Sequence, residues 1–312
     1  MKLALYQAPG QSYLLRNDLK DGKLSFTDVT SSIMPDVAEI GMVTDAVWAD
    51  YDGDNQVDLV VVGEWMPISV LLSDGATYTN QTNKLQLEDT RGWWFTIEQG
   101  DVDDDGDMDF ILGNLGKNYK YQATASETFD LYVKDFDQNA SSDIVLSYYN
   151  DGIQYPVRGR QCSSDQVPGI QTKFKDYESF ATATLAEIYG ESQIASADHY
   201  QIKSFASILL VNQGHGNYQT VALPIESQLS AIADICLLDV NEDGNTDIIT
   251  AGNLYMSEVE TPRNDAGIGC TLLGDGKGNF RYVGYQESGL LLNDDVRKLA
   301  LIKGKNNKFI LS

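Results

Sequence analysis

The sequence predicts an all-β fold, a β-propeller of at least five blades with six or seven also open, and three observations lead to it. A nine-residue acidic pattern recurs four times along the 312-residue chain. Each copy lies between short runs rich in Val, Ile and aromatic residues, which are typical of strands. The chain starts with runs that match the later strands of such a unit and ends with two more strands. We therefore expect the termini to pair in one composite blade.

The acidic pattern is clearest at residues 101–109, which read DVDDDGDMD. Carboxylates at the first, third, fifth and ninth positions suit one hard cation, because Ca²⁺ takes about six to eight oxygen ligands. The other copies are DYDGDNQVD at 50–58, DFDQNASSD at 135–143 and DVNEDGNTD at 239–247. A ligand pattern repeated in this way is typical of a repeat protein. We expect up to four structural Ca²⁺ ions.

The flanks of the acidic loops distinguish them from EF-hands. An EF-hand loop has about twelve residues, ends in Glu and lies between two helices. Here the ninth residue is Asp, and the runs around the first copy, VTDAVWAD and VDLVVVGEW, read as strands. The repeated unit is thus predicted to be a strand, a DxDxDG-type calcium loop, a second strand and one or two further strands.

The remaining strands follow from apolar runs separated by turn residues. At the start, KLALY, QSYLLRND and LSFTDVT are separated by Pro-Gly and Asp-Gly dipeptides. LLVNQGHGNY at 209–218 and LLGDGKGNF at 272–280 share a strand, a Gly-rich turn and an aromatic residue, so we expect hairpins there. The last residues, VRKLALIKGKNNKFILS, predict two strands.

A helical insertion is expected at residues 160–200, within the unit of the third acidic loop. Residues 176–189 carry apolar side chains at helical spacing, with Asp176 as N-cap and Gly190 as the stop. This segment is the one helix that the sequence predicts. We favour a covering role over an otherwise exposed sheet face, because the apolar stripe must be buried; a role in shaping a partner site stays open.

Composition limits the partners and the domain organisation. We expect residues 1–312 to form a single propeller domain. The formal net charge of −24 repels phosphate backbones, which argues against nucleic acid as a partner. The chain has no apolar stretch of about 18 residues, so we expect no membrane span. No secretory signal is recognised at the start, and an exported protein would therefore be represented by a mature part of a larger chain or complex.

The DxDxDGxxDL loops followed by LLxxxGxGxF phrases resemble the FG-GAP repeats of integrin α-chain propellers, also described as VCBS repeats in bacteria. The segments YLLRND, FTDVT, RGRQCSSDQVP and TLAEIYG further resemble a bacterial group related to cartilage acidic protein. In that group such repeats accompany an ASPIC/UnbV domain, which is not recognised in this sequence. The resemblance covers nearly the whole chain. It implies a calcium-bearing propeller at the extracellular or outer-membrane surface and no agreed reaction.

The resemblance also assigns candidate metal ligands by position. The third loop departs from the pattern, with Asn and Ala in place of the third acid and the glycine, so we expect the weakest site there. The seventh residues of the first two loops contribute their backbone carbonyls. The candidates are Asp50, Asp52, Asp54, Gln56 and Asp58; Asp101, Asp103, Asp105, Asp107 and Asp109; Asp135, Asp137, Asn139, Ser141 and Asp143; and Asp239, Asn241, Asp243, Asn245 and Asp247.

Catalytic motifs are not recognised in the sequence. The two histidines, His199 and His215, are expected at the surface. One cluster beside the insertion is a candidate ligand site, because aromatic rings stack on apolar faces and arginine pairs with carboxylates. An ordinary exposed strand shows the same alternation. The cluster comprises Tyr148, Tyr149, Tyr155, Arg158 and Arg160.

The sequence therefore favours a non-enzymatic, calcium-stabilised binding or scaffolding module at the bacterial cell surface. Its expected ligand is a glycan or a protein, in glycan capture or in assembly with an outer-membrane complex. Two alternatives stay open. One is a lyase-like polysaccharide enzyme that uses Tyr, Arg or His, and the other is a protein-binding adhesin.

Overall fold

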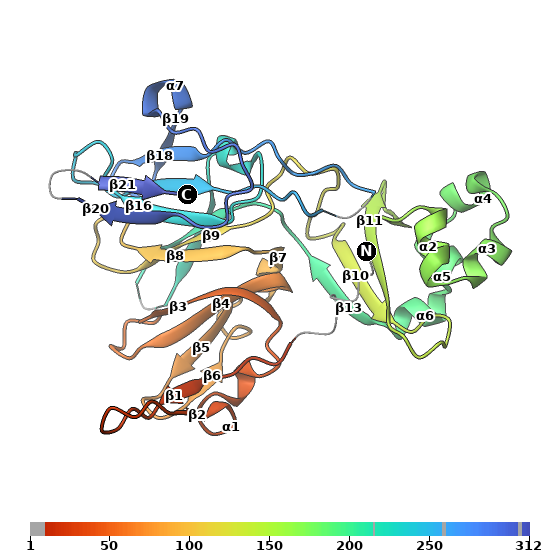
Figure 1. Ribbon diagram of the computed structural model, residues 1–312, viewed down its shortest axis with the longest axis horizontal. Helices are drawn as coiled ribbons and strands as arrows, with labels where there is room; N and C mark the ends of the chain where they lie inside the picture. Colours follow the sequence, from red (N-terminus) through yellow and green to blue (C-terminus); the bar gives the residue numbers. More distant parts are fainter. Residues whose placement is uncertain (1–9, 215, 258–259, 305–307) are drawn as a thin grey trace. The chain divides into compact units, whose positions relative to one another are not determined.

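The computed structural model describes residues 10–214, 216–257, 260–304 and 308–312, and this part of the chain is mostly β-sheet. It contains 21 strands and seven short α-helices (Figure 1). The paired strands run antiparallel in every sheet of these residues. The all-β prediction is therefore confirmed at this level. The predicted strand KLALY lies outside the described residues.

The chain divides into two compact units, each described here by itself. Unit 1 contains one sheet and the helical segment, whereas unit 2 contains the other sheets. The prediction of one domain over residues 1–312 stays a prediction. Unit 1 comprises Met1–Ala8, Lys120–Ser204 and Ser257–Pro262, and unit 2 comprises Pro9–Tyr119, Phe205–Met256 and Arg263–Ser312.

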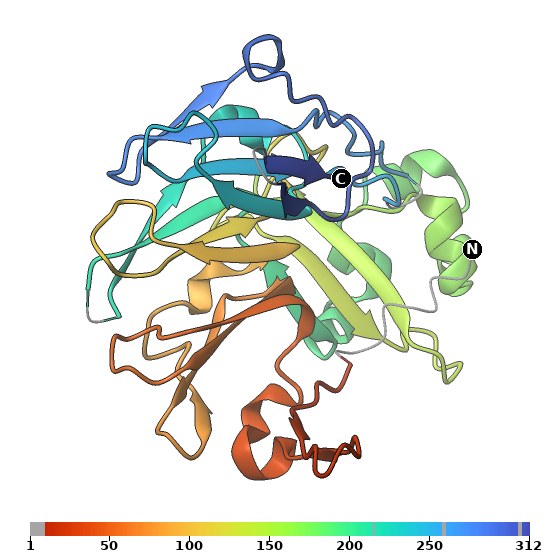
Figure 2. The same cartoon turned by 60° about the vertical axis from the view of Figure 1, so that its left-hand side comes forward.

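Unit 2 contains three larger antiparallel sheets, two of four strands and one of five (Figure 2). The first has the order β3 (Met42–Ala49), β4 (Asp58–Met66), β5 (Ser69–Ser73) and β6 (Tyr78–Asn80), with β7 (Gly92–Trp93) also paired to β4. The second has the order β15 (Tyr218–Ala222), β14 (Ile208–Asn212), β9 (Asp109–Gly113) and β8 (Thr96–Gly100). The third has the order β16 (Asp234–Leu238), β17 (Asp247–Ala251), β18 (Cys270–Gly274) and β19 (Phe280–Val283).

These three sheets pack face to face, which explains why their inner strands are apolar on both faces. Phe110 and Leu112 of β9 join one core with Val60 of the first sheet. The intervening Ile111 joins a second core with Ile248 of the third sheet. Successive side chains of a strand point to opposite faces. A strand between two cores is therefore a continuous apolar run, and each fully buried side chain of this size contributes about 1.5–3 kcal/mol.

The sheet of unit 1 has helices on one face. Its strand order is β12 (Ile153–Pro156), β11 (Asp143–Asn150), β10 (Phe129–Lys134) and β13 (Asp198–Ile202). The helices follow β12 in the chain and lie together beside this sheet (Figure 1). They are α2 (Arg160–Gln166), α3 (Gly169–Lys173), α4 (Tyr177–Ala181), α5 (Leu185–Tyr189) and α6 (Glu191–Ala195).

The prediction of a single helix over 176–189 is wrong, because two separate helices occupy this segment. Asp176 caps α4 as expected, its side chain accepting a hydrogen bond of 2.7 Å from the Ser179 N–H. Thr184 then starts α5 through a capping box with Glu187. A Thr side chain that bonds the backbone in this way favours a helix start over a helix interior. Gly190, at φ 92°, ends α5 as predicted.

The helices cover the sheet, as the favoured alternative predicted. Phe180, Leu185 and Ile188 share one buried cluster with Tyr132 and Val145 of the sheet. The sequence missed α2, α3 and α6, because helices of five to seven residues hold too few turns to show a clear apolar period.

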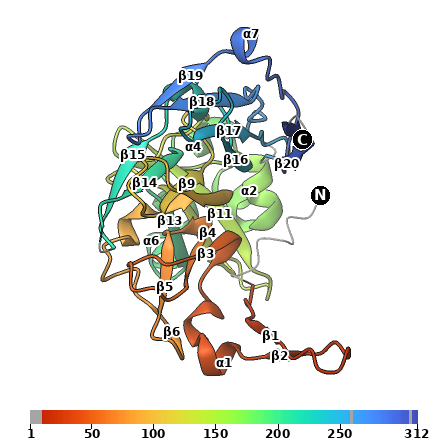
Figure 3. The same ribbon diagram turned by 90° about the vertical axis from the view of Figure 1, so that its left-hand side faces the viewer.

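Both chain ends carry two-stranded sheets within unit 2. They are β1 (Leu15–Asn17) with β2 (Phe26–Asp28), and β20 (Ala300–Lys303) with β21 (Lys308–Leu311). The composite blade that joins the termini stays a prediction. The hairpin β1–β2 is followed by α1 (Thr30–Ile33) (Figure 3). The other short elements are η1 (Pro35–Val37), η2 (Glu88–Thr90), η3 (Ile225–Gln228) and α7 (Tyr285–Ser288).

Across the described ranges, none of the helices has the length and apolar character needed to span a membrane.

Candidate functional site

Each acidic loop connects two adjacent antiparallel strands, as the sequence predicts. The strand pairs are β3–β4, β8–β9, β10–β11 and β16–β17. In all four, the ninth loop residue pairs with the residue just before the loop, as Asp109 does with Gly100. The two strands therefore bring the first and ninth loop positions close together.

The ninth-position aspartates are buried and connect the loop to the sheet. Asp109 is fully buried, and its Oδ2 accepts a hydrogen bond of 2.9 Å from the Val102 N–H at the second loop position. Its Oδ1 accepts one of 2.8 Å from the Asn212 N–H, at the end of β14. The same two contacts recur at Asp58 and Asp247. One carboxylate thus joins a loop and two strands in each of these sheets.

The third loop has only half of this arrangement among the residues described. Asp143 Oδ2 accepts a hydrogen bond of 2.9 Å from the Phe136 N–H. The neighbour of β11 on that side is β12, which begins after a tight turn at Asp151 and Gly152. No described backbone N–H of that strand donates to Asp143.

The first loop positions hold the turn in shape. Asp101 Oδ2 accepts a hydrogen bond of 3.0 Å from the Gly106 N–H, and the corresponding bond in the third loop runs from the Ala140 N–H to Asp135. The sixth residue lies in the left-handed region in every loop, at φ 94° for Gly106 and 66° for Ala140. Glycine adopts this conformation without a steric cost, whereas alanine does not.

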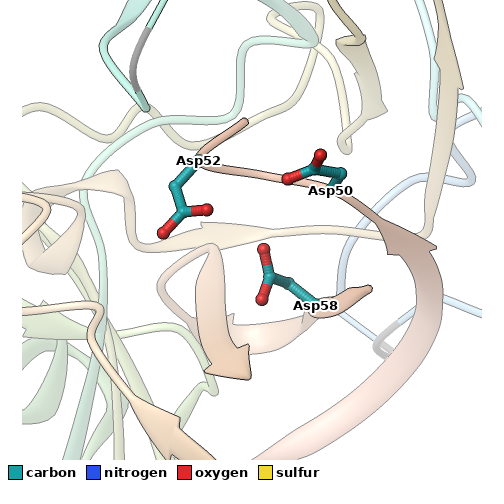
Figure 4. A group of neighbouring side chains, drawn as sticks. All are labelled: Asp50, Asp52 and Asp58. Carbon is teal, nitrogen blue, oxygen red and sulfur yellow. The ribbon is translucent and has the colours of Figure 1, made fainter. Parts of the chain in front are cut away.

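Three of the loops gather carboxylates around one point. Their first, third and ninth residues place one oxygen each within 4.8 Å of one another. Figure 4 shows the three side chains of the first loop directed toward a common centre. The fourth loop has Asn241 at the third position. The three groups are Asp50, Asp52 and Asp58; Asp101, Asp103 and Asp109; and Asp135, Asp137 and Asp143.

The electrostatics of these groups favour a cation. Burial, aided by neighbouring carboxylates, raises the pKa of Asp109 to about 6, and it raises the pKa values of Asp58 and Asp103 as well. Within the described residues, Asp101 Oδ1 and Asp103 Oδ1 are buried without a hydrogen-bond partner. A hard cation such as Ca²⁺ satisfies oxygens of this kind and offsets the repulsion. The donor set therefore fits a divalent hard cation.

The fifth and seventh positions contribute differently. The fifth side chain accepts a hydrogen bond from the backbone N–H of the seventh residue in all four loops. These contacts brace the turn, and the second carboxylate oxygens of Asp54 and Asp243 accept further bonds from the side-chain amides of Gln56 and Asn241. Ligation by these positions stays a prediction. The residues are Asp54 with Gln56, Asp105 with Asp107, Asn139 with Ser141, and Asp243 with Asn245.

The structure does not bring the five residues of the Tyr/Arg cluster onto one surface. Tyr148 lies opposite Tyr155 in the β11–β12 ladder, with ring centroids 6.2 Å apart, and 4.6 Å from the ring of Tyr121. Tyr149 is the next residue of the strand, so it points to the opposite face. The ligand-binding role of this cluster stays a prediction.

The two arginines of this cluster are buried. Arg160 Nε donates a hydrogen bond of 2.6 Å to the Phe174 carbonyl, and the guanidinium lies 5.2 Å from the Tyr177 ring centroid. Arg158 is 6% exposed. The carbonyl contacts indicate that Arg160 holds the helical segment in place.

His199 has a partner that the sequence did not reveal. Its side chain is 37% exposed, in keeping with the expected surface position, and its Nε2 lies 3.1 Å from Oδ1 of the fully buried Asp130. Asp130 was missed because it stands outside the acidic loops. The available signal was one charged residue inside the apolar run FDLYV. His215 lies outside the described residues.

The comparisons agree with the reading of the acidic loops. A family model described as FG-GAP-like repeat matches residues 50–112, which include the first two loops. The resemblance to FG-GAP repeats is therefore confirmed for this segment. The search of curated proteins found no match.

Proposed function

We propose that this chain is a calcium-stabilised binding module, built as a β-propeller, at the surface of a bacterial cell. The observation that carries the proposal is the repeated convergence of three carboxylates at the strand–loop–strand junctions. The FG-GAP-like match over two of these loops supports a binding or scaffolding role. The bacterial group related to cartilage acidic protein is part of the same proposal.

The metal has a structural role in this proposal. The ninth-position aspartates of the first, second and fourth loops are already bonded to backbone N–H groups of two chain segments, as Asp109 is to Val102 and Asn212. A cation held by the carboxylate oxygens of the first, third and ninth loop residues ties the loop to those segments. Binding a metal only in the folded state stabilises that state by about 2.7 kcal/mol at a concentration 100 times the Kd.

The propeller is supported by the size and stacking of the sheets. Two sheets of unit 2 and the sheet of unit 1 have four strands each, and the remaining large sheet has five. The middle sheet of unit 2 shares one core with the first sheet and another with the third. The two terminal hairpins have two strands each, so together they match one further four-stranded sheet. The three four-stranded sheets, the five-stranded sheet and the combined terminal hairpins thus give five blades.

The hydrogen bonds of the loop carboxylates support a binding role without catalysis. The loop carboxylates brace turns and strands, and this leaves them little freedom for proton transfer. The ligand is a glycan or a protein at the cell surface. The part of the chain outside the acidic loops, above all unit 1, supplies the surface that contacts this ligand.

The test is thermal unfolding with and without metal. The protein is stripped with a chelator, metal content is checked by elemental analysis, and the Tm is measured with Ca²⁺, with Mg²⁺ and without metal. We expect Ca²⁺ to raise the Tm by several degrees and Mg²⁺ to raise it less, because Mg²⁺ demands a smaller octahedral site. An unchanged Tm after verified removal contradicts the structural role. Release of unsaturated sugars from uronate polysaccharides would contradict the non-enzymatic role.

A further inference from the structure

A polar cluster on the helix-bearing face of the unit 1 sheet, the face that carries Tyr132, includes none of the loop carboxylates. It consists of Asp130, Tyr132, Ser147, Gln154 and His199, and we refer to it as the Asp130 cluster. Tyr132 pairs with His199 across β10 and β13, and Asp130 pairs with Ser147 across β10 and β11. Alternate residues of a strand share a face, so these side chains lie together.

Asp130 is surrounded by hydrogen-bond donors. Its Oδ1 accepts a bond of 2.8 Å from the Thr128 hydroxyl and lies 3.1 Å from His199 Nε2. Its Oδ2 accepts one of 2.8 Å from Gln154 Nε2. An ionised carboxylate only accepts, so the proton between Asp130 and His199 belongs to Nε2. Asp130 thereby selects one tautomer of His199.

In the neutral imidazole, the selected tautomer leaves Nδ1 of His199 as a hydrogen-bond acceptor. The ring also stacks on Tyr132, with centroids 4.3 Å apart and an interplanar angle of 6°. Two contacts therefore fix the imidazole, and its side chain is still 37% exposed. No described atom forms a hydrogen bond with Nδ1. A rigid, accessible acceptor of this kind suits a ligand that donates a hydrogen bond.

The surrounding groups favour an uncharged ligand. Asp130 and Glu127 both act on Tyr149, which lies on the same face, and burial is the larger cause of its raised pKa. Lys134 lies on the same face, where its Nζ donates a hydrogen bond to the Ser196 hydroxyl, but only the two acids act on Tyr149. A ligand carboxylate or phosphate meets repulsion there, whereas a hydroxyl group does not. Tyr149 and Gln201 are half-buried on the same face and offer an aromatic ring and an amide, and Gln201 lies two residues from His199 on β13.

We propose that the Asp130 cluster forms the binding site for a neutral carbohydrate, with His199 Nδ1 accepting a hydrogen bond from a sugar hydroxyl. Asp130 is a positioning residue that acts through His199. Tyr149 and Gln201 complete the contact face. This proposal rests on the binding-module function above and names its ligand class and location.

Imidazole ¹⁵N NMR tests the proposal directly, because the chain has only two histidines. The signals are assigned with His199→Gln. We expect His199 to show the Nε2–H tautomer near neutral pH. Neutral methyl glycosides of glucose, galactose, mannose and N-acetylglucosamine are then titrated, with glucuronate as the acidic comparison. We expect at least one neutral glycoside to shift Nδ1 of His199 and to leave His215 unchanged.

Two variants and a matched control separate positioning from folding. Asp130→Asn removes the charge that selects the tautomer, so we expect a mixture of tautomers at His199. We also expect about tenfold weaker glycoside binding, which corresponds to the loss of the hydrogen bond to Nδ1. Asp198→Asn makes the same change at an exposed residue next to His199, whose side chain points to the opposite face of the strand, and is expected to bind normally. His199 is partly exposed, so His199→Gln serves as the test variant if Asp130→Asn does not fold.

The outcomes are distinct from those of the proposed function. An Nδ1–H tautomer in the native protein, or no response of His199 to any neutral glycoside, overturns this proposal and leaves the calcium test intact. Preferential binding of glucuronate also overturns it. A calcium-independent Tm contradicts the proposed structural metal and leaves the His199 result to stand by itself.

Discussion

Asp109 accepts a hydrogen bond of 2.8 Å from the backbone N–H of Asn212, a residue 103 positions later in the chain. The contact joins the second acidic loop to a strand formed from a distant segment. It explains why this aspartate is fully buried while Asp107, two residues earlier, is exposed. The ninth loop position therefore belongs to the sheet as much as to the metal site.

The first prediction concerns this contact. Asp109→Ala leaves the N–H groups of Val102 and Asn212 without their acceptor in a buried setting, at about 1–3 kcal/mol each. We expect the metal-free protein to lose about 3 kcal/mol of unfolding free energy, measured by urea denaturation. Asp107→Ala removes an exposed carboxylate of the same loop and is expected to cost less than about 1 kcal/mol. Equal losses would argue against the bridging role.

The second prediction concerns the sixth loop position. Ala140 has φ 66°, a conformation that costs an L-residue about 1–2 kcal/mol, so Ala140→Gly is expected to stabilise the protein by about 1 kcal/mol. Gly244 is the equivalent residue of the fourth loop at φ 93°, and a Cβ there meets no atom within 4 Å. Gly244→Ala therefore tests the backbone effect alone and is expected to destabilise by a similar amount. Chemical denaturation of both variants measures it, and two changes of the same sign contradict the explanation.

The third prediction concerns the fourth loop, where Asn241 stands at the third position. Asn241→Asp restores the acid found in the other three loops. Calcium affinity rises with ligand charge, so calorimetry is expected to show tighter binding at one site. The added repulsion is expected to lower the Tm of the metal-free protein. Asn245→Asp, at a position whose backbone N–H donates to Asp243, is the control and is expected to change affinity less.

The fourth prediction concerns the start of α5. Thr184→Ala removes the N-cap, at a cost of about 1 kcal/mol. Hydrogen bonds from the Thr184 backbone and side chain hold the pKa of Glu187 below its ordinary value. A lowered folded-state pKa stabilises the protein above the unfolded value of 4.5, and this stabilisation is lost as the pH falls through the folded-state pKa.

Unfolding curves at neutral and acidic pH check this prediction. The difference between the native protein and Thr184→Ala is expected to shrink as the pH falls below 4.5. Thr182→Ala is the control, because Thr182 lies between the two helices and its side chain does not cap α5. A difference that does not change with pH would show that Glu187 takes no part in the cap.

Much of the local structure was predictable because its causes are local. The acidic loops were found from their spacing, since carboxylates at alternate positions of a turn are favourable when they surround one cation. Asp176 and Gly190 were found because a cap depends on neighbouring residues. The break at Thr184 was missed, since an apolar period continues across a helix end when both helices cover the same sheet.

The sequence by itself determined the all-β class, the four strand–loop–strand units and the carboxylates that converge in three of them. These depend on residues within one turn or one hairpin. Only the tertiary structure decided that Tyr148 lies against the rings of Tyr121 and Tyr155 and that Arg160 is buried. It also placed His199 beside Asp130, 69 residues earlier in the chain. Strand pairing sets such contacts, and its register depends on distant segments that no local pattern records.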